Sequence, residues 1–129
     1  MFVDNKVYDE LSRQAKASPR LRLAYDLRNT PEENSQRMLN AIEPGTEIPI
    51  HRHWDSTETV LCVRGHFQEL LYDEEGKLEE VIDLVPGGVI VNVPKGKWHN
   101  LRSLETGTIL FEAKHGKYEP MRPEDILEM

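Results

Sequence analysis

The sequence has little of what several classes of protein need. Its one cysteine, Cys62, excludes an intramolecular disulfide and a metal site made of thiolates alone. Lys and Arg number 16 against 23 Asp and Glu, and the net charge of −7 argues against a general binder of nucleic acid or membrane surfaces. No apolar run reaches the roughly 18 residues of a membrane span, and the N-terminal residues lack the apolar stretch of a signal peptide. We therefore expect a soluble, cytoplasmic protein that binds neither nucleic acid nor membranes.

The basic residues are unevenly distributed along the chain. Residues 11–28 carry one acidic residue, Asp26, and five basic ones, which are Arg13, Lys16, Arg20, Arg22 and Arg28. A run of this kind is more often a solvated helix face and loop, and we favour that interpretation. The alternative is a strip that receives an anionic ligand or the acidic face of a second subunit.

Residues 4–16 have the periodicity of a helix. Val7, Leu11 and Ala15 recur four residues apart with charged residues between them, and Ser18-Pro19 would end the helix. An isolated helix of this length is marginal in water, so it needs a surface to pack on, either the barrel or a partner chain. We expect residues 1–35 to form a helical arm that packs on the domain that follows.

From Gln36 onward, short apolar segments alternate with turn residues. The segments are QRMLNAIE, TEIPIHRH, ETVLCVR, HFQELLY, KLEEVIDL, VIVNV, WHNLRSL and TILFEAK. Close spacing of this kind is typical of an antiparallel sandwich or barrel. We expect an all-β barrel over residues 36–118 and a tail with a short helical turn over residues 119–129. Edge strands and the helical arm favour a homodimer over a monomer.

Three of the five histidines lie in two short groups, His51-Arg52-His53 and Lys97-Trp98-His99. Side chains two residues apart on a strand share a face, so His51 and His53 can converge on one ion while Arg52 faces away. Glu58 lies at an odd offset from His53, but a turn at residues 54–57 would bring it back to the same interior. We predict that one divalent metal ion is bound by His51, His53, Glu58 and His99.

Other residues near these groups are weaker candidates. Cys62 lies roughly 13 Å along the strand from Glu58, too far to share an ion, and is expected to be buried in the barrel. With His99 facing inward on a regular strand, Leu101 and Ser103 should face inward as well. Asn100 and Arg102 should then face outward.

We assign no catalytic residue from the sequence. Arg37 and Asn40 precede the first histidine group and differ by an odd offset, so only one of them can face a pocket. Three aromatic residues could frame the pocket mouth, although packing is the commoner role beside a barrel: these are Tyr25, Trp98 and Tyr118. His66 and His115 fall outside the pattern, and we expect both at the surface.

The spacing of the histidine groups resembles both signature motifs of the cupin superfamily. The first motif is matched by Gly45, His51, His53, Glu58 and Gly65, and the second by Gly88, Pro94, Gly96 and His99. The second motif departs from the pattern at its last position, where Ser103 replaces an Asn that is not a metal ligand. The resemblance implies a double-stranded β-helix, or jelly-roll barrel. The motif glycines fall at junctions that need turns or close backbone approach.

Beyond the motifs, the order of segments is similar to that of the WbuC-type cupins. The similarity extends over residues 4–120 and includes SPRLR, QRMLNAIEPGT, LLYDEEG, KGKWHNL and GTILFEAKHGKYEP. It implies a metalloprotein associated with bacterial surface-polysaccharide (O-antigen) genes, and it implies no defined reaction.

Three imidazoles and one carboxylate leave positions open on a divalent ion. Such a site suits Fe, Mn, Ni, Co or Zn and permits isomerase, epimerase or oxygenase chemistry. Our first hypothesis is an enzyme that acts on a small polar molecule such as a sugar or sugar acid. The alternatives are a non-catalytic module, in which the metal holds a small ligand or stiffens the barrel, and a structural partner in a biosynthetic complex.

Overall fold

Alternating apolar and polar side chains make strands the main regular structure of the chain. The structure is a computed structural model that describes residues 2–127. Within these residues the strands are β1 (Arg22–Asp26), β2 (Ser35–Ile42), β3 (Glu58–Arg64), β4 (Phe67–Tyr72), β5 (Leu78–Leu84), β6 (Val91–Val93), β7 (Trp98–Ser103) and β8 (Thr108–His115). One α-helix, α1 (Asn5–Ala17), precedes them, and a 3-10 turn, η1 (Pro123–Asp125), follows them. No helix among the described residues is long and apolar enough to cross a membrane.

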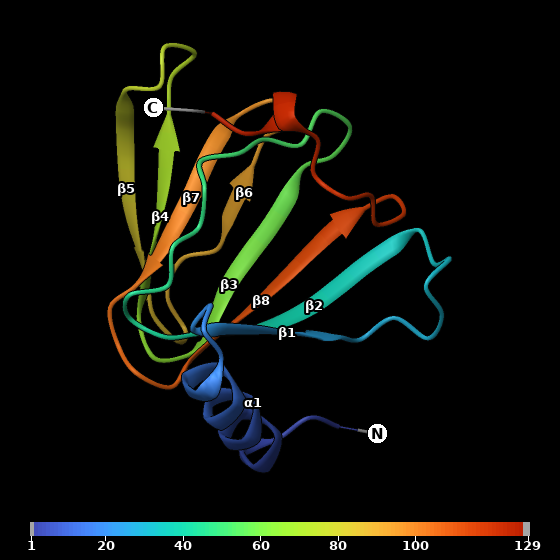
Figure 1. Ribbon diagram of the computed structural model, residues 1–129, viewed down its shortest axis with the longest axis vertical. Helices are drawn as coiled ribbons and strands as arrows, with labels where there is room; N and C mark the ends of the chain where they lie inside the picture. The colour runs from blue at the N-terminus through green and yellow to red at the C-terminus, as the bar shows by residue number, and fades with distance from the viewer. Residues whose placement is uncertain (1, 128–129) are drawn as a thin grey trace.

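The strands form two antiparallel sheets that face each other (Figure 1). The larger sheet has the order β1-β2-β8-β3-β6, and the smaller has the order β5-β4-β7. Apolar residues from both inner faces form one core, which includes Val60, Phe67, Leu71, Val93 and Leu110. The predicted all-β jelly-roll architecture is confirmed.

The helix predicted near the N-terminus is also confirmed. Asp4 caps α1, because its side-chain oxygen accepts hydrogen bonds from the backbone N–H groups of Lys6 and Val7 at 3.1 and 3.4 Å. Leu11 and Ala15 are buried against the outer face of the larger sheet. The core under α1 is therefore separate from the core between the sheets.

Two stretches differ from the sequence-based expectation. Residues 22–26 form β1, which pairs with β2 and extends the larger sheet, although their sequence pattern revealed no strand. The segment TEIPIHRH, predicted to be a strand, is irregular, and its isolated β-bridges are the two that His51 forms with His99 and Ile126. Pro49 has no N–H to donate to a ladder, and neighbouring backbone groups pair with the C-terminal segment instead. Arg52 N–H donates to the Asp125 carbonyl at 3.0 Å, and Leu127 N–H donates to the Ile50 carbonyl at 2.8 Å.

Gly65 lies in the turn between β3 and β4, where it allows the backbone to approach Thr108 of β8 closely. Its φ of +88° lies in the left-handed region, and a Cβ placed on it would come within 2.7 Å of the Thr108 Cα. Backbone atoms cannot move aside as a flexible side chain can, so a larger residue would displace β8. Glycine is therefore required at this position of the first motif both for the positive φ and for the close contact with the Thr108 backbone.

We predict that Gly65→Ala destabilises the protein by about 2–4 kcal/mol, because left-handed strain and overpacking act together. Gly87→Ala is the matched control, since Gly87 also has a positive φ, +74°, but has no atom within 4 Å of the position that an added Cβ would take. Urea unfolding of both variants measures the difference. Equal losses of stability in the two variants would show that the contact with Thr108 contributes nothing.

Candidate metal centre

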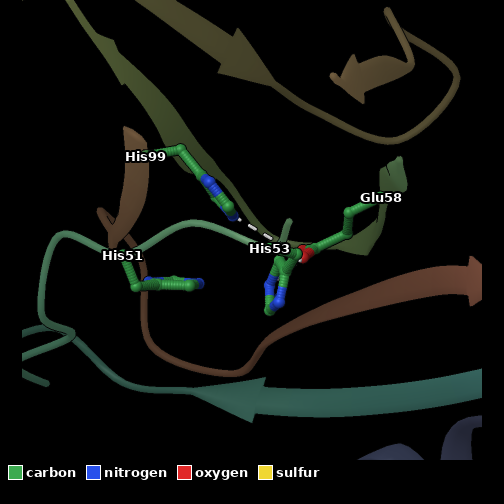
Figure 2. Close-up of side chains that lie close together, drawn as sticks. All are labelled: His51, His53, Glu58 and His99. Carbon is green, nitrogen blue, oxygen red and sulfur yellow. Dashed lines mark ion pairs between the residues drawn. The ribbon is translucent and has the colours of Figure 1, made fainter. Parts of the chain in front are cut away.

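Four side chains from three parts of the chain meet inside the barrel: His51, His53, Glu58 and His99 (Figure 2). Their nearest ligand atoms all lie within 4.8 Å of one another. Glu58 opens β3, with Val60 and Cys62 on the same inward face, and His99 lies on β7. The structure thus brings together all four residues that the sequence selected.

Backbone pairing fixes His51 against His99. The two residues exchange hydrogen bonds, with His51 N–H donating at 2.9 Å and His99 N–H donating at 2.8 Å. Their ring centroids lie 4.3 Å apart. The convergence predicted for His51 and His53 is therefore reached without the regular strand on which the prediction was based. His53 is held separately, because its carbonyl accepts a hydrogen bond from Gly96 N–H at 2.7 Å.

Two imidazoles have their tautomers set by backbone carbonyls. Nδ1 of His51 lies 2.8 Å from the Pro49 carbonyl, and Nδ1 of His99 lies 3.0 Å from the Lys97 carbonyl. A carbonyl only accepts, so each Nδ1 carries a proton, and in the neutral imidazole Nε2 is the atom with the lone pair. Nε2 of His99 is buried and has no hydrogen-bond partner among the described residues. An orphaned imidazole lone pair of this kind is what a metal ligand requires.

The electrostatics of the cluster also suit a cation. Burial alone would raise the pKa of Glu58, but the imidazoles of His53 and His99 outweigh it and hold that pKa well below its usual value. The Glu58 carboxylate lies 3.0 Å from His53 Nε2 and 3.6 Å from His99 Nε2. Burial, assisted by the charge of His99, lowers the pKa of His51 to about 4. A neutral imidazole beside an ionised carboxylate is a donor set that divalent metal ions accept, so the residues fit a metal.

Arg52 faces away from the cluster, as its position between two inward histidines predicts. Its guanidinium lies between the rings of Trp54 and Trp98, 3.8 and 3.9 Å from their centroids. It also forms an ion pair with Glu74 at 3.3 Å. Trp98 is buried in this stack and does not frame a pocket mouth. Sequence reasoning missed the stack, although each tryptophan directly adjoins a histidine of the cluster.

We expect Arg52→Lys to weaken metal binding by about 10- to 100-fold, the range seen when outer partners of ligands are changed. Lysine keeps the charge but cannot stack its planar group between two indoles. Metal titration of the purified variant measures the change. Arg102→Lys, on the outer side of β7, is the control, and an equal affinity for both variants would contradict a role for the stack.

A cavity of about 390 Å³ adjoins the cluster. Asn40 lines it and Arg37 does not, because Arg37 forms an ion pair with Glu33 at 2.8 Å. Only one of the two faces the pocket, as their odd offset required. The predicted mouth residues Tyr25 and Tyr118 do not line this cavity.

The remaining sequence predictions are resolved by burial. Cys62 is 4% exposed and belongs to the core, as expected. Leu101 and Ser103 turn inward with His99, and Arg102 is exposed. Asn100 is a correction: it was expected to face outward, yet it is half-buried, lines the cavity and accepts a hydrogen bond from the Tyr72 hydroxyl at 2.8 Å.

Two further carboxyl groups line the cavity and were missed by sequence reasoning. Glu69, on β4, is 0% exposed, and neither of its oxygens has a hydrogen-bond partner in the described chain. Glu112, on β8, accepts a hydrogen bond from the Asn40 side chain at 3.0 Å. Burial, then the charge of Glu58, raises the pKa of both carboxyl groups well above the usual value. The inward parity of Glu69 with Phe67 and Leu71 was the signal that could have found it.

Glu69→Gln should change how stability depends on pH in the metal-free protein. The native pKa of Glu69 is raised, so its contribution is most favourable below the unfolded value of about 4.5 and is lost as pH rises toward the native pKa. Relative to wild type, the variant should gain up to about 1.4 kcal/mol per pH unit across that interval. Urea unfolding from pH 4.5 upward measures this, with the exposed Glu80→Gln as control. A stability difference independent of pH would show that Glu69 is ionised in the folded protein.

Comparison with solved structures supports the cupin fold. KdgF from Halomonas sp. is 20% identical with a TM-score of 0.62, and the match covers 78% of this chain and 84% of that one. TT1209 from Thermus thermophilus is 20% identical with a TM-score of 0.65, over 90% of this chain and 98% of that one. Oxalate decarboxylase from Bacillus subtilis, whose Mn(II) centres have been studied, is 21% identical with a TM-score of 0.60. That match covers 77% of this chain but only 26% of the decarboxylase.

These similarities establish a cupin fold, and no curated protein matches the chain. The family assignment comes from the N-terminal two-thirds of the chain. The model of a domain of unknown function, DUF6016, matches residues 3–84, and the chain therefore belongs to this family.

Proposed function

We propose that the protein is a metal-dependent cupin that binds one divalent ion through His51, His53, Glu58 and His99 and acts on a small polar molecule. The observation that carries this proposal is the buried Nε2 of His99, which has no hydrogen-bond partner within residues 2–127 and lies close to the other ligand atoms of the cluster. A bound divalent ion supplies Lewis acidity to an oxygen atom of the ligand. The Mn(II) centres of the structurally similar oxalate decarboxylase favour a transition metal.

The protein residues divide into two roles in this proposal. His51 and His99 hold the ion through Nε2, because their Nδ1 protons are used by the Pro49 and Lys97 carbonyls. The cavity holds the ligand beside the ion, where Asn40 and Glu69 offer hydrogen-bonding groups. A volume of about 390 Å³ suits a molecule of monosaccharide size rather than a polymer.

The chemical class of the ligand follows from this polar lining and from the resemblance to WbuC-type cupins. We propose a sugar or sugar-acid derivative connected with bacterial surface-polysaccharide synthesis, converted by isomerisation, epimerisation or oxygenation. A non-catalytic role is the second candidate. It is favoured by Glu58, whose carboxylate lies 3.0 Å from His53 Nε2 and 3.6 Å from His99 Nε2, so that a metal held between them would join β3 to β7 and stiffen the barrel.

Metal analysis tests the centre directly. Anaerobically purified protein should contain one divalent ion per chain, and His51→Ala and His99→Ala should each lose most of it because they remove a ligand. His66→Ala is the control, since His66 instead pairs with Asp83 at 2.7 Å. Wild-type protein without a divalent ion would refute the metal centre.

Sugar acids and nucleotide sugars, screened with and without O₂, then separate the two candidate roles. Metal-dependent product formation that is lost in His51→Ala supports an enzyme. Thermal stabilisation by a ligand without any product supports the binding module.

A further inference from the structure

Two arginines at the metal cavity lack the acidic partners that most arginines of this chain have. Carboxylate partners are present for Arg13, Arg28, Arg37, Arg52, Arg64 and Arg122. Within residues 2–127, Arg20, Arg22 and Arg102 have none. Arg20 and Arg22 both line the 390 Å³ cavity that contains the metal cluster, whereas Arg102 does not.

The backbone holds the two arginines at this cavity. Leu21, between them, has a φ of +56° and is the one described non-glycine residue with positive φ. Its carbonyl accepts a hydrogen bond from Glu43 N–H at 2.9 Å, and the Arg20 carbonyl accepts one from the Thr46 hydroxyl at 2.8 Å. A left-handed conformation at leucine is unfavourable and persists only when the surrounding structure imposes it. The spacing of the two arginines is therefore set by the fold.

The charges of Arg20 and Arg22 are uncompensated. Partial burial, and then the nearby charge of Arg20, lowers the pKa of Arg22. The Arg22 guanidinium donates to one neutral acceptor, the Glu47 carbonyl, at 3.3 Å. Arginine remains charged at neutral pH, so two like charges at the rim of a cavity are stabilised when an anion binds between them.

The deeper carboxyl groups of the cavity do not supply that anion. Glu58 is engaged by His53 and His99, and Glu112 accepts from Asn40. Neither Glu112 nor Glu69 has an ion pair with Arg20 or Arg22. The cavity therefore combines a cationic rim with a hydrogen-bonding interior.

We propose that Arg20 and Arg22 form an anion subsite at the cavity rim, and that the ligand carries a carboxylate or phosphate bound there while its polar remainder extends toward the cluster. This inference rests on the proposed function for the identity of the ligand, but the subsite itself does not require a bound metal. For Arg20 and Arg22, two of the five basic residues in the segment 11–28, this proposal favours the alternative interpretation that the segment receives an anionic ligand. Arg13 and Arg28, by contrast, are paired with Glu10 and Asp26.

Titration with three probes tests the subsite. The probes are gluconate, glucose 6-phosphate and the uncharged glucose, and binding is followed by calorimetry on metal-free and metal-loaded wild-type protein. At least one acid should bind more tightly than glucose, and the tighter acid identifies the group that the subsite takes. If neither acid binds more tightly than glucose, the subsite is wrong.

Variants that remove the charge of Arg20 or Arg22 provide a second test of the subsite. Arg22→Gln and Arg20→Gln should each weaken binding of the preferred acid by about tenfold or more, because each removes a charged hydrogen-bond donor. Arg22→Lys should keep part of the affinity. Arg102→Gln is the matched control, since Arg102 also lacks a carboxylate partner but donates to Gln68 at 2.9 Å, away from the cavity. Unchanged acid affinity in both subsite variants would overturn the proposal.

Metal content separates this inference from the proposed function. All four variants should keep the metal content of wild type, because none changes a residue of the cluster. If wild-type protein holds no metal but Arg22→Gln loses acid binding, the subsite stands and the metal centre fails. If metal is bound and acid affinity is unchanged in the variants, the metal centre stands and the subsite fails.

Discussion

Two backbone hydrogen bonds between His51 and His99 fix half of the candidate site, and the other two residues are arranged around this pair. They join an irregular segment to β7 and place two imidazoles side by side, with their ring planes tilted by 51°. His53 follows two residues later, and Glu58 opens the next strand. A regular strand was not required, because one bridge and the pairing with the C-terminal segment hold the loop in place.

The barrel and the four-residue cluster were predictable because both depend on short-range patterns. Alternation of side chains assigns Glu58, Cys62 and His99 to the interior, and the motif spacing brings the histidines together. The irregular course of residues 46–53 was not predictable in this way. Their pairing partners, Asp125 and Leu127, lie far away in the sequence, and pattern reasoning on a local window cannot include them.

Most of the other features that the sequence-based prediction missed involve charged residues. Arg52 and Glu69 were both natural candidates for the surface, since isolated charged residues are seldom buried. The contact of Arg52 with Trp98 becomes visible only when distant segments are assembled, whereas the inward parity of Glu69 along β4 was present in the sequence. Strand β1 was missed for a related reason: its alternation is weak, and its pairing with β2 makes it a strand.

The cavity retains polar groups that a barrel selected for stability alone would replace by apolar ones. Glu69 has no partner among the described residues, and leaving a buried carboxyl group unsatisfied is unfavourable. Leu21 is held in an unfavourable backbone conformation near the same cavity. Both features lie within or beside one pocket, which is where strained and unsatisfied groups are expected when they serve binding.

The distance along the chain between His51 and His99 also bears on the order of events during folding. A pair so distant meets only after a long loop has closed, and contacts of this kind form slowly compared with those of α1. The cluster therefore comes into existence once β3, β4 and β7 have assembled around it. An ion held by all four residues would therefore find its complete set of ligands only after His51 and His99 have paired.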